Sequence, residues 1–145
     1  MVLLVFGVFL LGAKKIPITI KSDRMEVIED QNLVVFTGHV VAKRKDLTLY
    51  TDRLIVYYQK KDGRREIEKL VAVGHVKINK GEWVARSGKA VYFKKEEKIV
   101  LEDNPQVWQD ENTIRGERII LYLNENRSVA ESGPGHKAEV TIFEE

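Results

Sequence analysis

The sequence predicts an all-β fold made of antiparallel hairpins stacked one on another. A short phrase recurs at residues 22–27, 51–56 and 87–92, and a weaker copy stands at 116–121. Beyond Ala13, apolar and polar residues alternate, and no segment keeps the period of an amphipathic helix. Repeats of this size indicate that one supersecondary unit has been copied and stacked. In each copy a small or acidic polar pair leads into a strand pattern.

A second phrase interleaves with the first. The segment at residues 36–40 recurs at residues 72–76, so that Gly38-His39 corresponds to Gly74-His75. Successive residues of a strand point to opposite faces, and by this alternation both glycines stand at positions whose side chains would face the interior. Glycine has no side chain to place there. Such glycines indicate a β-bulge or a close approach of another part of the chain.

Sixteen short strands are expected, separated by turns rich in Gly, Asn, Asp and Pro. In order they cover residues 16–21, 25–28, 33–37, 39–43, 47–50, 53–59, 66–73, 75–78, 82–86, 89–94, 98–101, 106–109, 113–115, 118–123, 128–131 and 139–143. The Asp62-Gly63 turn indicates an extended hairpin inside the longer repeat interval. Many short antiparallel strands in one domain indicate a sandwich, a barrel or a jelly roll.

The N-terminal sequence is typical of an export signal. Residues 1–13 carry no charged side chain and are almost wholly apolar, and Lys14-Lys15 ends the run. The run is shorter than the about 20 residues that a membrane-spanning helix needs. It matches the apolar region of a secretory signal, with Leu11-Gly12-Ala13 as the cleavage site. The alternative is a buried N-terminal strand. We expect a signal peptide at 1–13 and one β domain at 14–145.

Composition excludes several classes of protein. The 145 residues include no cysteine, which excludes disulfides, thiolate zinc sites and lipid anchoring through an N-terminal cysteine. Charged residues make up 32% of the chain and nearly balance, with a net charge of +2. This balance argues against nucleic-acid binding, which normally needs a basic excess on one face.

Parity also predicts which side chains face the interior, because successive side chains of a strand point to opposite faces. The apolar residues two and four places after each turn residue share one face, and the same register extends to the neighbouring strands. The predicted interior is Met25, Val27, Leu54, Val56, Ala90, Tyr92, Ile119, Leu121, Ile18, Ile20, Leu47, Leu49, Trp83, Ala85, Ile114, Val34, Phe36, Val40, Leu70, Ala72, Val76, Ile78, Leu101 and Val107. This set contains no residue that is charged at neutral pH, so we expect an apolar interior without a catalytic pocket. An ordinary closed core would show the same pattern.

No motif indicates an enzyme, and we expect no cofactor and no metal. Ser87 does not lie in a G-x-S-x-G turn. Asp23 and Asp52 stand at the heads of strands, where we expect them to hydrogen-bond the local backbone. By parity, His39 and His75 point outward. They could lie near each other, because they occupy equivalent positions in stacked repeat units. Exposed histidines without nearby carboxylates make a poor metal site.

The ordered phrases resemble the OstA-like family. The matching stretches are residues 16–23, 34–40, 51–54, 72–76, 90–92, 99–105 and 114–119, which together span the chain beyond the apolar N-terminus. The resemblance implies a half-open antiparallel β-jelly roll in the periplasm, whose apolar trough receives the lipid A acyl chains of lipopolysaccharide. It also implies head-to-tail stacking into a bridge between inner-membrane and outer-membrane partners that carry similar jelly rolls.

The resemblance also bears on particular residues. Family positions that line the lipid path correspond to Ile18 and Tyr92, while a third corresponds to Lys94, where an apolar residue is usual. The full set of expected lipid-binding residues is Ile18, Ile20, Phe36, Val40, Leu49, Leu54, Val56, Ile78, Ala90, Tyr92, Leu101, Ile119 and Leu121. Two alternatives stay open: an inner-membrane-anchored member of the same family, and a structural β-repeat module that binds no lipid. Residues 16–21 and 139–143 are the expected joints of the filament.

Overall fold

The computed structural model describes residues 16–144, so the expected signal at 1–13 lies outside the described part of the chain. The all-β expectation is confirmed. Twelve antiparallel strands make up a single sheet, and one 3₁₀ turn, η1, lies between β2 and β3. The elements are β1 Thr19–Lys21, β2 Arg24–Ile28, η1 Glu29–Gln31, β3 Leu33–Arg44, β4 Leu47–Lys61, β5 Arg64–Lys80, β6 Trp83–Phe93, β7 Lys98–Glu102, β8 Gln106–Gln109, β9 Asn112–Arg115, β10 Arg118–Tyr122, β11 Arg127–Glu131 and β12 Glu139–Thr141.

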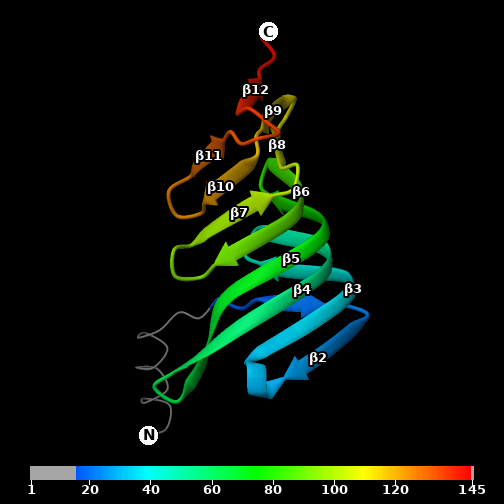
Figure 1. The fold of residues 1–145 in the computed structure, drawn as a ribbon, viewed down its shortest axis with the longest axis vertical. Coiled ribbons are helices and arrows are strands. Elements are labelled where there is room, and N and C mark those ends of the chain that lie inside the picture. Colours follow the sequence, from blue (N-terminus) through cyan, green and yellow to red (C-terminus); the bar gives the residue numbers. More distant parts are fainter. Residues whose placement is uncertain (1–15, 145) are drawn as a thin grey trace, which may run out of the picture.

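The strand number is twelve rather than about sixteen, because four pairs of expected short strands are continuous. Each of the four longest strands, β3 to β6, joins two expected strands into one (Figure 1). The Thr51-Asp52 phrase, expected as a turn, is a bend inside β4, and the Gly-His phrases, expected to separate two strands each, are bends inside β3 and β5. The pairing registers shift between Thr37 and Val40, between Tyr50 and Arg53, and between Val73 and Val76. The expected bulges at Gly38 and Gly74 are thereby confirmed.

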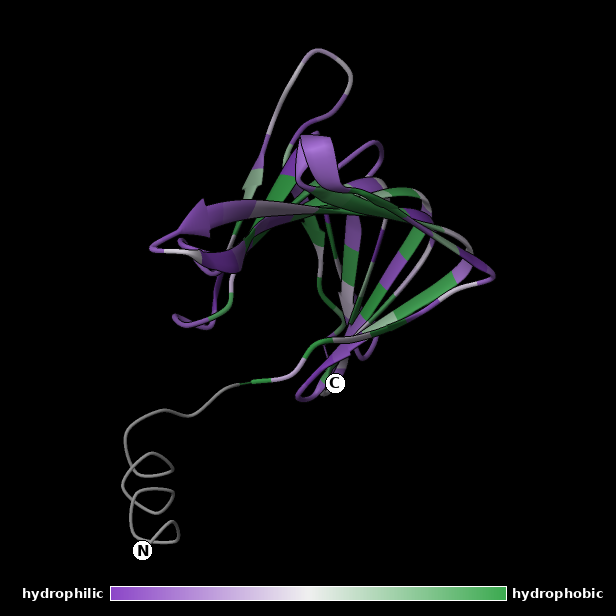
Figure 2. Cartoon of the chain, turned by 90° about the horizontal axis from the view of Figure 1, so that it is seen from below, coloured by the Kyte–Doolittle hydropathy of each residue, from purple (hydrophilic) through white to green (hydrophobic). Residues whose placement is uncertain are grey.

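The bends divide the sheet into two halves that share the long strands. Half-sheet 1 runs β2-β3-β4-β5-β6-β7-β10-β11, and half-sheet 2 runs β1-β3-β4-β5-β6-β8-β9-β12. The division is visible at β3, where β2 pairs with residues 33–37 and β1 pairs with residues 41–43. Viewed along the long axis, the strands curve around a common interior (Figure 2). The arrangement is an open β-jelly roll.

The line of bends, at Gly38, Thr51, Gly74 and Gly88, is called the apex below. Gly38 and Gly74 have φ values of +87° and +90°, which disfavour a side chain. A Cβ at either glycine would lie 2.6 Å from an Oδ2 atom, of Asp23 or of Asp52 respectively. Only glycine therefore lets the aspartate side chain approach the backbone so closely.

Apolar side chains from both half-sheets fill the interior as one cluster. Leu54, Leu101 and Ile119 are fully buried. The expected interior positions Met25 and Val27 are corrected, because they are 59% and 51% exposed. Both lie on β2, an edge strand that pairs only with β3, so no neighbouring strand covers them.

Candidate functional site

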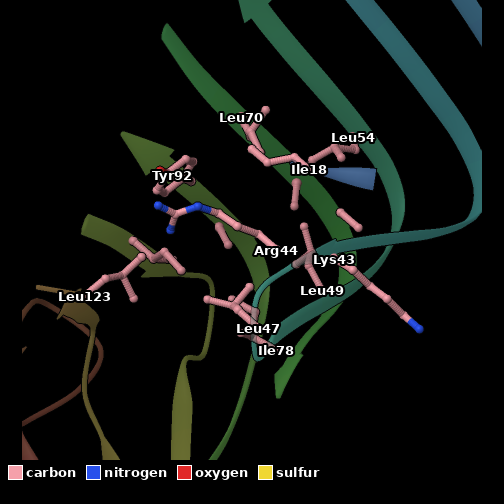
Figure 3. A pocket seen from close by; sticks show the side chains of 14 residues that line it. Ile18, Lys43, Arg44, Leu47, Leu49, Leu54, Leu70, Ile78, Tyr92 and Leu123 are labelled. Atoms are coloured by element: carbon pink, nitrogen blue, oxygen red, sulfur yellow. The ribbon is translucent and has the colours of Figure 1, made fainter. Parts of the chain in front are cut away.

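The centre of the roll holds an apolar cavity between the two half-sheets. Its volume is about 50 Å³ (Figure 3). The lining side chains come from the segment before β1, from β3, β4, β5, β6 and β7, and from the residue that follows β10. They are Ile18, Ala42, Lys43, Arg44, Leu47, Leu49, Leu54, Leu70, Ala72, Ile78, Ala90, Tyr92, Ile99 and Leu123.

Two wider cavities lie at the ends of this central one. The cavity toward the N-terminal strands measures about 1090 Å³ and shares Ile18 with the central cavity. The cavity toward the C-terminal strands measures about 500 Å³ and shares Leu123 with it. The three cavities therefore succeed one another along the interior, and the central one is the smallest. We call the series the trough.

The structure gathers the expected site residues into one interior. Eleven of the thirteen belong to the buried core, and Ile20 packs against it. The set that lines the central cavity is Ile18, Leu49, Leu54, Ile78, Ala90 and Tyr92. Leu121 lines the C-terminal cavity. Five others, namely Phe36, Val40, Val56, Leu101 and Ile119, are buried in the same core without lining any of these three cavities.

Sequence reasoning missed Ala42, Lys43, Arg44, Ile99 and Leu123. The expectation of an interior without charged groups is therefore wrong, because Arg44 lines the central cavity. Arg44 continues the interior parity of Val40 and Ala42 on β3, and that parity was the signal that could have found it. In sequence alone, however, a charged residue at the end of a strand indicates the start of a turn rather than an interior position.

Arg44 belongs to a polar cluster with Tyr92 and Glu97. The Arg44 Nη2 atom donates to Glu97 Oε1 over 2.8 Å, and the Tyr92 hydroxyl donates to Glu97 Oε2. The guanidinium carbon lies 6.0 Å from the centroid of the Tyr92 ring. The side chains of Arg44 and Glu97 are only 17% and 15% exposed. Figure 3 shows Arg44 reaching along the cavity toward Tyr92.

The cluster changes the pKa values of its members. Burial raises the pKa of Tyr92, and the hydrogen bond to Glu97 raises it further. Burial alone would raise the pKa of Glu97, but hydrogen bonds from Tyr92 and Arg44 and the charges of Arg44 and Lys94 hold it below its usual value. Glu97 is therefore an anion at neutral pH and Tyr92 a neutral donor. The cluster is a closed network of complementary charge.

Lys94, at the position where the family usually carries an apolar residue, is exposed and lines the wide N-terminal cavity. The same cavity takes in Phe93 and Glu97, which belong to the same hairpin. Lys94 therefore lies at the rim of the trough, next to its narrow section.

The Asp-His pairs at the apex differ from expectation. Asp23 and Asp52 do not bond the local backbone through their carboxylates: the two Oδ2 atoms lie 2.7 Å from Nδ1 of His39 and His75 on the next strand. The local backbone bond is made by the preceding residue, as Ser22 Oγ donates to the Arg24 carbonyl. Within residues 16–144, no group of three or more His, Asp or Glu could hold a metal ion.

Over the described residues, none of the helical structure is long or apolar enough to cross a bilayer. A sequence profile for the family "LptA/(LptD N-terminal domain) LPS transport protein" matches residues 19–127. No curated protein matches the chain significantly.

Among solved structures, the fold is similar to LptH from Pseudomonas aeruginosa, described as the LptA-homologous periplasmic component of the conserved lipopolysaccharide transport device. The two chains are 22% identical, the match covers 88% of this chain and 96% of that one, and the TM-score is 0.77. At this identity the likeness establishes the jelly-roll fold.

Proposed function

The chain belongs to the family of LptA and the LptD N-terminal domain, which are lipopolysaccharide transport proteins, and we propose that it is an LptA-like periplasmic bridge. In this proposal the trough binds the lipid A acyl chains, and stacked copies pass the lipid from the inner to the outer membrane. The observation that carries the proposal is the apolar lining of the central cavity, which a larger cavity adjoins at each end.

The physical chemistry of the trough suits acyl chains. Each methylene removed from water contributes about 0.8 kcal/mol. Side chains such as Leu49, Leu54 and Ile78 offer no polar group that would be left without a partner. Transfer along a bridge requires that successive sites resemble one another, and a stack of identical protomers provides such sites. No catalytic group or nucleotide site is needed for this role.

The test is site-specific photo-crosslinking to lipopolysaccharide. A photoreactive amino acid at Ile18 or Tyr92 should capture the lipid, because both side chains line the central cavity. The matched controls are Arg53 and Lys89, which are exposed on the outer parity of β4 and β6. Equal capture at all four positions would contradict a trough that binds acyl chains.

We propose that the ends of the roll join copies head to tail. At one end β1 and β2 each pair only with β3, and at the other β11 and β12 pair only with β10 and β9. These edges carry exposed apolar side chains, including Met25 at 59% and Ile142 at 65% exposure. Because the two ends differ, the contact is heterologous and propagates as a filament. LptC-like and LptD-like jelly rolls would cap the inner and outer ends.

Deletion of residues 138–145 should abolish growth of the filament, measured by light scattering over a concentration series. Val140→Glu, on β12, should act in the same direction, because Val140 is 57% exposed on that edge. Val73→Glu is the matched control, as Val73 is 41% exposed but lies on β5, away from both ends. Unchanged growth of the truncated chain would show that β12 is not the joint.

We also propose that residues 1–13 are removed on export. N-terminal sequencing of the native protein should begin near Lys14. Recovery of an intact Met1 in a membrane fraction would favour the inner-membrane-anchored alternative.

A further inference from the structure

The narrow centre of the trough raises the question of how a ligand passes it. Its volume of about 50 Å³ compares with about 1090 and 500 Å³ at the two ends. The central section is therefore by far the smallest of the three, and we expect its walls to move apart when an acyl chain passes it.

The Arg44–Glu97 ion pair crosses this narrow section. Arg44 ends the part of β3 that belongs to half-sheet 2, and Glu97 lies in the turn between β6 and β7 of half-sheet 1. The other side-chain ion pairs of residues 16–144 join residues close in sequence or on adjacent strands. Arg44–Glu97 is thus the ion pair, within this part of the chain, that ties the two half-sheets together across the interior.

Separating the pair has unequal consequences for its members. Glu97 lines the wide N-terminal cavity together with Lys94, and it keeps the hydrogen bond from Tyr92. Arg44 instead lies among the apolar side chains of the central cavity, and it cannot lose its charge. A buried charge without a partner is strongly unfavourable. A ligand that opens the section must therefore bring an anionic group for Arg44.

We propose that Arg44 recognises the anionic head group of the amphiphile whose acyl chains enter the trough, by exchanging Glu97 for a phosphate. The inference rests on the proposed function in taking the trough as an acyl-chain site. A guanidinium matches phosphate oxygens with two parallel hydrogen bonds, so the exchange replaces one charge-assisted contact with another. A neutral amphiphile of equal chain length must open the pair without offering this replacement.

The test compares two amphiphiles with the same chain, dodecyl phosphate and dodecyl maltoside, by isothermal titration calorimetry below their micelle concentrations. The wild type should bind dodecyl phosphate at least about tenfold more tightly than dodecyl maltoside. A hydrogen bond to a charged group contributes more free energy than a tenfold difference in affinity requires. Arg44→Met should lose that preference, and its affinity for the maltoside should rise rather than fall, because no ion pair is left to open. Arg53→Met, the same change on the outer face, should retain the preference.

A second variant separates recognition from a structural effect. Glu97→Gln removes the anion that competes for Arg44, so dodecyl phosphate should bind several-fold more tightly while dodecyl maltoside changes less. A purely structural role would change both affinities alike. Inorganic phosphate alone should neither bind measurably at the same concentration nor displace dodecyl phosphate, because the chain supplies much of the binding free energy.

Two results would overturn the inference. One of them leaves the proposed function standing, and the other contradicts the proposed function as well. If both amphiphiles bind equally, or if Arg44→Met keeps the phosphate preference, then Arg44 does not recognise the head group and the acyl-chain trough stands. If neither amphiphile binds the wild type, then the proposed function fails as well.

Discussion

The two sides of the roll, apex and mouth, are held together in different ways. At the apex β3 to β6 pass from one half-sheet to the other without a break, and Gly38 and Gly74 let the neighbouring Asp side chains pack directly on the backbone. At the mouth, where the turns after β3 and β6 meet, the Arg44–Glu97 pair bridges the half-sheets. Chain continuity and close packing thus fix one side, while a single ion pair fixes the other. The comparison indicates a hinge at the apex and a separable mouth.

The largest effect should come from filling the apex. Gly74→Ala should destabilise the fold by about 2–4 kcal/mol, because the left-handed backbone is strained by a Cβ and the Cβ meets Asp52. Gly63→Ala is the matched control: Gly63 has φ +75° but no atom within 4 Å of a built Cβ, so about 1 kcal/mol is expected. Urea denaturation measures both. Equal losses would mean that the contact with Asp52 is unimportant.

The mouth should respond less, and reversibly. Arg44→Met should cost about 1–3 kcal/mol, because it leaves Glu97 without its main partner. Arg44→Met combined with Glu97→Leu should recover part of that loss, since an apolar pair can replace an ion pair, but the Tyr92 hydroxyl then loses its acceptor. Denaturation of the single and double variants measures the coupling, and an additive loss in the double variant would contradict a direct interaction between the two side chains.

The pH dependence of the mouth has a definite sign. The folded state lowers the pKa of Glu97 from 4.5. The stabilisation from this carboxylate is therefore present above pH 4.5 and is lost as the pH falls through the lowered value. The difference in stability between the wild type and Glu97→Gln should shrink over that acid range.

The smallest effect concerns the apex histidines. Hydrogen bonds and charge from Asp23 and Asp52 raise the pKa values of His39 and His75 above 6.5. Because both pKa values are raised, this stabilisation is present below pH 6.5 and is lost as the pH rises through the raised values.

NMR titration checks the two pairs separately. Asp23→Asn should lower the pKa of His39 and leave that of His75 unchanged. Asp52→Asn should lower the pKa of His75 strongly and that of His39 slightly, because the Asp52 charge also acts on His39. The same shift of both histidines in both variants would contradict the pairwise contacts.

The sequence predicted the strands, the bulges and most of the interior, because alternation and glycine placement are local signals. It could not tell a break between two strands from a bulge inside one: Gly38-His39 looks the same in both cases, and only pairing with β4 on both sides makes β3 continuous. The exposure of Met25 was unpredictable for a similar reason. Parity fixes the face of a side chain, whereas burial depends on whether another strand covers it.

The candidate site was predicted in its apolar part and missed in its polar part. Ile18, Leu54 and Tyr92 followed from parity, and the structure places them on one cavity. Glu97 could not be found, because it stands in a turn 53 residues from Arg44 and the contact exists only after both half-sheets have folded around the interior. Long-range polar contacts of this kind leave no periodic signal.

The central claim, a fixed apex with a mouth that opens for lipid, is tested most directly by distances between paired spin labels. The chain has no cysteine, so labels can be placed freely. Lys45→Cys with Lys95→Cys spans the mouth, and Arg53→Cys with Arg86→Cys spans the apex, all at exposed positions. Adding lipopolysaccharide should lengthen the mouth distance and leave the apex distance unchanged. A mouth distance that stays constant while lipopolysaccharide binds would contradict the account.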